Sequence, residues 1–144
     1  METATADPTR LRFDSLDYVT TPDGSGRVSV RLEWDGERYE GTAACLETQQ
    51  GVLRAAAKAT LVATMTSSAG GQSSSPLDLE VLGVKAVRAF DGWVVVTRIH
   101  GQAGAEQHRL LGAAPCESED ELPAAAVRAA LDASQQLLEQ RFEG

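Results

Sequence analysis

An internal repeat is the feature that most constrains the fold of this chain. A glycine followed four positions later by a cysteine occurs as Gly41 and Cys45, and again as Gly112 and Cys116. An alanine-rich segment follows each cysteine at nearly the same spacing. Self-similarity of this kind indicates a duplicated structural unit. We therefore expect two copies of one unit in the chain.

The first copy opens with three strand-like segments. Residues 27–34 alternate strictly between apolar and polar side chains, which is typical of a strand with one wet face. Residues 12–20 and 38–46 are rich in aromatic and β-branched or small residues, and they flank this segment. Asp35 and Gly36 both tolerate a positive φ, so they predict a hairpin turn.

The second copy repeats the order of the first. Residues 79–90, 93–99 and 107–116 are predicted strands, with a bend at Gly83. Residues 100–106 are rich in glycine and alanine, and we interpret them as a loop. The alignment of the two copies matches Val28 and Val30 with Val94 and Val96.

A helix follows the third strand of each copy. Residues 50–67 and 122–140 are rich in good helix formers, and alanines dominate both segments. Pro123 suits a first helical turn. The predicted fold is α+β: a tandem, pseudo-two-fold β-β-β-α repeat with antiparallel sheets and two helices.

The expected organisation is one compact domain made of two units. The chain has 144 residues, which is the usual size of a single domain. A segment rich in serine and glycine near its middle is typical of a flexible linker. The predicted boundaries are a flexible N-terminus over 1–10, a first unit over 11–66, a linker over 67–76 and a second unit over 77–144.

Charge and composition exclude several classes of function. The formal net charge is −8, and the arginines and lysines do not cluster. Binding to nucleic acid or to an anionic membrane needs a basic surface, so neither is expected. Residues 1–10 lack the apolar run of a signal peptide. Two cysteines are compatible with free thiols in a reducing compartment, and we expect a cytoplasmic protein.

The repeat resembles a known family. The segments that carry the resemblance are residues 28–36, 40–44, 53–59, 79–87, 111–114 and 124–133. They resemble the C-terminal regulatory domain of the 2-isopropylmalate synthase family, here as a stand-alone domain without the catalytic barrel. The resemblance implies a tandem β-β-β-α fold, dimerisation and a ligand-binding site near the dimer interface.

Four residues are candidates for a ligand site. Cys45 and Cys116 occupy equivalent positions in the two copies, and they could form a thiol site or line a pocket. The alternative is that both are small buried residues, which is usual for free cysteine. Trp34 and Trp93 stand beside tight turns, where an indole can line a pocket or pack across a sheet.

No motif identifies a catalytic, cofactor or metal site. His100 and His108 flank the predicted loop, but their spacing matches no zinc motif. The acidic run 117–121 could hold a cation or begin a helix, where carboxylates are favoured. The sequence has no phosphate-binding loop, nucleophile elbow or zinc-protease motif. We expect no cofactor and no metal.

The surfaces of the two helices predict a homodimer. Both helices are apolar over most of their circumference, whereas a surface helix normally has one apolar stripe. We expect a second chain to cover the surplus positions, and we expect glutamate at Val62 or Val127 to weaken the dimer without unfolding the monomer. The surplus positions are Ala55, Ala57, Leu61, Val62, Met65, Ala125, Val127 and Leu138.

The function that fits best is a stand-alone, non-enzymatic regulatory or small-ligand-binding domain that acts as a homodimer. One alternative is a small enzyme of unrecognised type that uses Cys45, Cys116, His100 or His108. Another is a protein–protein adaptor that binds no ligand. The sequence does not identify the ligand.

Overall fold

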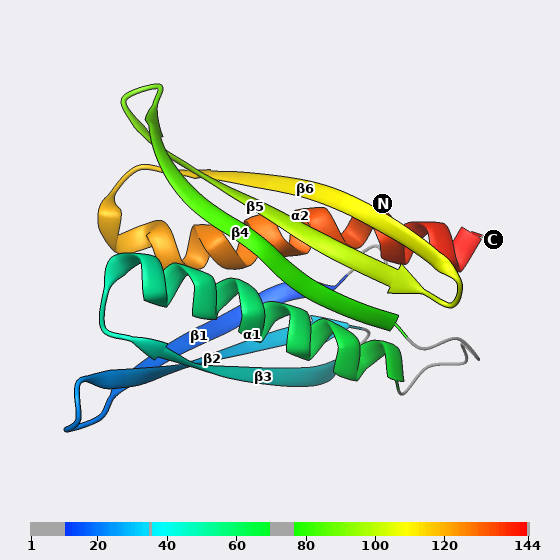
Figure 1. Ribbon diagram of the computed structural model, residues 1–144, viewed down its shortest axis with the longest axis horizontal. Coiled ribbons are helices and arrows are strands. Elements are labelled where there is room, and N and C mark those ends of the chain that lie inside the picture. Colours follow the sequence, from blue (N-terminus) through cyan, green and yellow to red (C-terminus); the bar gives the residue numbers. More distant parts are fainter. Residues whose placement is uncertain (1–10, 35, 70–76, 144) are drawn as a thin grey trace.

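The chain folds into three layers, with two helices enclosed between two sheets (Figure 1). The computed structural model describes residues 11–34, 36–69 and 77–143. Each sheet is antiparallel and has three strands in sequence order. The elements are β1 (Arg12–Thr20), β2 (Ser25–Trp34), β3 (Glu37–Leu46), α1 (Gln49–Ala69), β4 (Leu77–Ala89), β5 (Gly92–Ala103), β6 (Glu106–Cys116), a 3-10 turn η1 (Glu119–Glu121) and α2 (Leu122–Glu143).

This order confirms the predicted tandem β-β-β-α repeat. The two helices lie side by side and run in the same direction (Figure 1). The bend predicted at Gly83 is a β-bulge between Val81 and Gly83. Helix α1 continues to Ala69, into the segment expected to be the linker. The remainder of that segment and the expected flexible N-terminus lie outside the described residues.

A glycine in each copy lets a helix approach its sheet closely. A Cβ atom on Gly41 would collide with the carbonyl oxygen of Ala59 in α1. A Cβ atom on Gly112 would collide in the same way with the carbonyl oxygen of Ala129 in α2. The two glycines, which first indicated the repeat, therefore have the same structural role in both copies.

The helices are apolar over most of their circumference because each packs on its own sheet and on the other helix, and α1 also packs against β4. Ala55, Ala57 and Leu61 on α1 and Val127 on α2 are all buried within the single chain. A second chain is therefore not needed to cover them, and that part of the dimer prediction is wrong, since other elements of the same chain supply the cover. Val62 and Met65 are half-buried, Ala125 is buried, and the side chain of Leu138 lies outside the described residues.

Strand β5 differs from its prediction in length and in register. It continues to Ala103, so His100 lies in a strand and not in a loop. Gly41 is paired with Val30, whereas the equivalent Gly112 is paired with Thr97. The alignment of Val28 and Val30 with Val94 and Val96 is therefore wrong by one residue. A shift of one residue exchanges the faces of a strand.

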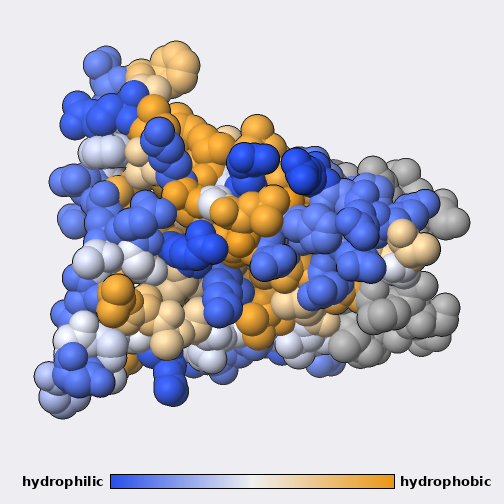
Figure 2. All heavy atoms as spheres, in the orientation of Figure 1, coloured by the Kyte–Doolittle hydropathy of each residue, from blue (hydrophilic) through white to orange (hydrophobic). Residues whose placement is uncertain are grey.

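The outer faces of the two sheets differ in polarity, because the outward positions carry charged side chains on the first sheet and apolar ones on the second. On the first sheet, the Arg31 guanidinium lies 3.3 Å from an Asp17 carboxylate oxygen and 3.9 Å from one of Glu40. On the second sheet, hydrophobic side chains gather along β4 and β5 below the hairpin tip (Figure 2). The register places these apolar residues on the outer face: Val87, Val94, Val96, Leu111, Ala113 and Pro115.

Candidate functional site

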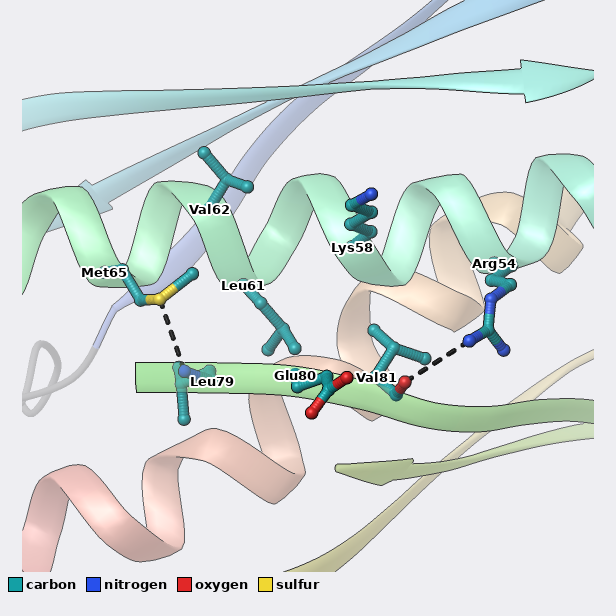
Figure 3. A pocket seen from close by; sticks show the side chains of 8 residues that line it. All are labelled: Arg54, Lys58, Leu61, Val62, Met65, Leu79, Glu80 and Val81. Atoms are coloured by element: carbon teal, nitrogen blue, oxygen red, sulfur yellow. Dashed lines mark hydrogen bonds between the residues drawn. The ribbon is translucent and has the colours of Figure 1, made fainter. Parts of the chain in front are cut away.

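A groove between α1 and β4 is a candidate site among the described residues. Its volume is about 270 Å³, close to the lower end for pockets that hold small molecules. Five residues of one helix and three of one strand line it (Figure 3). The lining residues are Arg54, Lys58, Leu61, Val62, Met65, Leu79, Glu80 and Val81.

Side chains of α1 hold the groove in shape through contacts with the β4 backbone. The Arg54 guanidinium donates a hydrogen bond to the Val81 carbonyl oxygen at 3.3 Å. At the other end, the Leu79 N–H donates to the Met65 sulfur at 3.3 Å. Both contacts satisfy backbone groups of an edge strand that would otherwise face solvent. They hold the strand at a set distance from the helix.

The groove combines an apolar floor with charged rims. Leu61 points toward β4 and is buried, and Met65 lies beside it (Figure 3). Lys58 and Arg54 are exposed and lie one helical turn apart, with Lys58 at the rim away from β4. Glu80 is exposed on the strand side. These groups suit the binding of a charged molecule with an apolar part.

The predicted residues Cys45 and Cys116 occupy equivalent strand ends on different sheets. Cys45 is paired with Gly26 in β2, and Cys116 is paired with Trp93 in β5. Cys116 and Trp93 both line a shallow, open hollow of about 660 Å³ beside the β4–β5 hairpin, together with Phe90. The Arg88 guanidinium lies 5.2 Å from the centroid of the Trp93 ring.

Trp34 lies far from the cysteine of its own sheet. It ends β2, whereas Cys45 is paired with Gly26 near the beginning of that strand. At the usual rise of a strand, the two ends are about 26 Å apart. The structure thus brings Trp93 and Cys116 together and leaves Trp34 and Cys45 apart.

Both thiols are partly exposed, and neither has a depressed pKa. Burial and the nearby Glu47 carboxylate raise the pKa of Cys45. Burial, and then the Glu121 carboxylate, raise the pKa of Cys116. The Cys116 thiol donates a hydrogen bond to the Ser118 carbonyl oxygen at 3.5 Å. A raised pKa lowers the thiolate fraction, and the thiolate is the reactive form.

The two histidines face opposite sides of one sheet. His100 is paired with Arg109, and His108 is paired with Gly101, one position along. Adjacent positions on paired strands present their side chains to opposite faces. In the described part of the chain, no group of three or more histidine, cysteine or acidic residues could hold a metal ion.

The acidic run before α2 forms a helix start. One carboxylate oxygen of Glu121 accepts hydrogen bonds from the N–H groups of Glu117 at 2.9 Å and Ser118 at 3.1 Å. These bonds lower the pKa of Glu121. The arrangement is a capping box, which satisfies backbone donors at a helix N-terminus. It accounts for Glu121 without a bound cation.

The groove residues were not among those predicted from the sequence. Arg54 and Lys58 lie four positions apart in a predicted helix, which is ordinary for a solvated face. Their relation to Leu79 and Glu80 depends on the packing of α1 against a strand of the other repeat. No local pattern in the sequence encodes that contact.

Comparison with known proteins assigns no family. No model of a known protein family matches the chain, and no curated protein gives a significant sequence match. Within the described residues, neither helix has an apolar stretch long enough to cross a lipid bilayer.

Proposed function

We propose that this protein is a non-enzymatic, small-ligand-binding regulatory domain whose site is the groove between α1 and β4. The observation that carries the proposal is the pair of cations, Arg54 and Lys58, above an apolar floor that includes Leu61 and Met65. The fitting ligand is a small carboxylate with a short apolar tail. Glu80 adds an acceptor for an amino group on the same ligand.

The residue types in the groove support binding over catalysis. The eight lining residues include no serine, threonine, cysteine or histidine. These are common nucleophiles and proton-transfer groups in enzymes, and the two lining residues of other types that can transfer protons, Lys58 and Glu80, are both exposed to solvent. Arg54 uses one N–H on the Val81 carbonyl oxygen and has further donors for an anion.

A thermal-shift and calorimetric titration tests the proposal. The probes are short straight- and branched-chain carboxylates, each with and without an α-amino group, and the matching primary amides. A ligand that binds only the folded state raises its melting temperature. We expect the carboxylates to bind and the amides to fail. Equal binding of amides and carboxylates, or no binding at all, overturns the proposal.

Two matched substitutions locate the site. Lys58 in α1 and Arg128 in α2 are equivalent exposed cations of the two copies, but only Lys58 lines the groove. We expect Lys58→Gln to weaken carboxylate binding about fivefold through loss of a charge-assisted contact. Arg128→Gln should leave the affinity unchanged. Equal effects of the two variants would indicate that the net charge of the protein, and not a contact with Lys58 in the groove, determines the affinity.

We also propose that the domain is a homodimer, as the resemblance to the regulatory domain of the 2-isopropylmalate synthase family implies. The helix surfaces no longer support this part, because they are covered within the chain. What supports it is the outer edge of β3, where the described residues of α1 leave backbone groups without a hydrogen-bond partner from their side chains.

A further inference from the structure

Three of the four strands at the sheet edges are protected against pairing with another chain. The first two, β1 and β4, carry register shifts, between Phe13 and Ser15 and between Val81 and Gly83. Bulges of this kind disturb the regular row of backbone donors and acceptors that another strand would need for pairing. The third, β6, is regular, but two side chains of α2 hydrogen-bond to backbone groups of its outer edge.

The cover on β6 consists of two side chains one helical turn apart. Asp132 accepts a hydrogen bond from the Ala113 N–H at 3.2 Å. Gln136 donates to the Leu111 carbonyl oxygen at 3.0 Å. These are outward-facing backbone groups of the edge strand, and both are satisfied from within the chain.

The equivalent cover is missing on β3. In the repeat, Thr42 of β3 corresponds to Ala113 of β6, and Glu40 to Leu111. On the helices, Val62 of α1 corresponds to Asp132 of α2, and Thr66 to Gln136. Val62 has no polar atom, and the Thr66 hydroxyl donates to the Val62 carbonyl oxygen of its own helix at 2.9 Å.

The backbone contacts of the two glycines support this equivalence. A Cβ built on Gly41 meets the Ala59 carbonyl oxygen and the Ala63 nitrogen, and one built on Gly112 meets those of Ala129 and Ala133, so the two helices correspond at a spacing of 70 residues. Strand β3 pairs with β2 in unbroken register from Glu37 to Leu46. Among the described residues, β3 is therefore the regular edge strand that α1 leaves uncovered.

We propose that β3 pairs antiparallel with β3 of a second copy of this chain, so that two sheets join into one of six strands. This deepens the homodimer part of the proposed function and names its interface. A strand that pairs with its own copy about a two-fold axis is self-complementary, which is the symmetry of the commonest soluble oligomers. Because a two-fold contact uses the same surface on both chains, the assembly closes at two chains.

The side chains of β3 favour a two-fold axis that passes between Thr42 and Thr42 of the second copy. With the axis there, residues 38–46 of the two strands lie opposite each other. It places Glu40 opposite Ala44 of the second copy and Arg38 opposite Leu46, so no like charges face each other. An axis at Glu40 would place two carboxylates opposite each other. Leu46, which is 69% exposed in the single chain, gains cover from the Arg38 side chain.

Sedimentation analysis of the full chain and its variants tests the interface. The double substitution Val62→Asp, Thr66→Gln copies the α2 cover onto α1. We expect it to occupy the Thr42 N–H and the Glu40 carbonyl oxygen and to raise the dimer dissociation constant about tenfold or more. Circular dichroism melting verifies that the double variant folds.

A second pair of variants gives the same test without altering a helix. Thr42→Lys places two ammonium groups opposite each other at the axis, and we expect it to weaken the dimer about fivefold. Ala113→Lys makes the equivalent change on β6 and should leave the dimer intact.

The outcomes distinguish this inference from the proposals on which it rests. A dimer of unchanged affinity in Thr42→Lys overturns the β3 interface and leaves the homodimer standing. A wild-type chain that is monomeric at high micromolar concentration overturns both. Carboxylate binding in the groove is measured separately, so its failure does not affect this result.

Discussion

At the residue scale, the most unusual position is the tip of the β4–β5 hairpin. Phe90 has a φ of 57° and Asp91 a φ of 60°, so both central residues of the turn are left-handed. That geometry belongs to type I′ turns, which favour asparagine and glycine. Phe90 is also 96% exposed. The predicted strands 79–90 and 93–99 leave residues 91 and 92 for the turn, so the observed turn lies one residue earlier.

Replacing Phe90 should stabilise the protein. Asparagine tolerates a left-handed conformation, so Phe90→Asn is expected to raise the free energy of unfolding by about 1 kcal/mol. Urea denaturation measures the change. Phe90→Ala is the matched control, because it removes the ring but keeps the backbone strain. A gain of equal size in both variants would show that the exposed ring, and not the φ angle, is the cause.

The two thiols lead to a prediction about pH. Because burial raises the pKa of Cys45 and of Cys116, the native protein should react slowly with a thiol reagent at neutral pH. The rate should rise only above pH about 8.5, the ordinary pKa of a cysteine. Stopped-flow labelling of native and denatured protein measures both rates.

The sign of the pKa shift also sets the pH dependence of stability. A raised pKa in the folded state gives a stability contribution that is complete below the unfolded pKa and is lost as the pH rises through the folded pKa.

Fast labelling of either native thiol at neutral pH would contradict the raised pKa of that cysteine and would favour the enzyme alternative.

At the scale of the elements, the contact between each helix and the third strand of its copy depends on one glycine. Gly41 and Gly112 each have a helix carbonyl oxygen where a Cβ would lie. Strand and helix cannot separate without disturbing the contacts between that helix and the other helix.

Alanine at either glycine should therefore be destabilising. We expect Gly41→Ala and Gly112→Ala each to lower the free energy of unfolding by about 1–3 kcal/mol, the usual effect of overpacking. The matched control is Gly83→Ala, since a Cβ on Gly83 meets no atom within 4 Å. Chemical denaturation compares the three variants, and a large loss for Gly83→Ala alone would contradict this account.

At the scale of the whole molecule, the enclosure of the helices between two sheets changes the expected effect of glutamate at two positions. Val127 is fully buried, whereas Val62 is half-buried and lines the groove. The sequence-based prediction treated both as positions on a dimer surface. The structure separates them into a core position and a position beside the β3 edge.

Val127→Glu should unfold the monomer, because a buried carboxylate without a partner is highly unfavourable. Val62→Glu should leave the fold intact, since its side chain reaches solvent. Circular dichroism melting of the two variants is the measurement. A folded, monomeric Val127→Glu protein would restore the original dimer argument.

Local patterns in the sequence were enough to predict the elements and their duplication. Strict alternation in β2, glycines at Gly36 and Gly83, and the alanine-rich helices each act within a few residues of the chain, and each was identified correctly. The glycine pair also indicated the repeat, because close packing of a helix on a strand requires the same small residue in both copies.

Only the tertiary structure decided what surrounds the elements. The continuous apolar run in β5 permits either register, so the outward position of Val94 and Val96 depended on pairing with β6. The apolar circumference of the helices suggested a second chain, and other elements of the same chain supplied the cover. The groove and the uncovered β3 edge arise from contacts between residues distant in the sequence, and such contacts leave no periodicity in it.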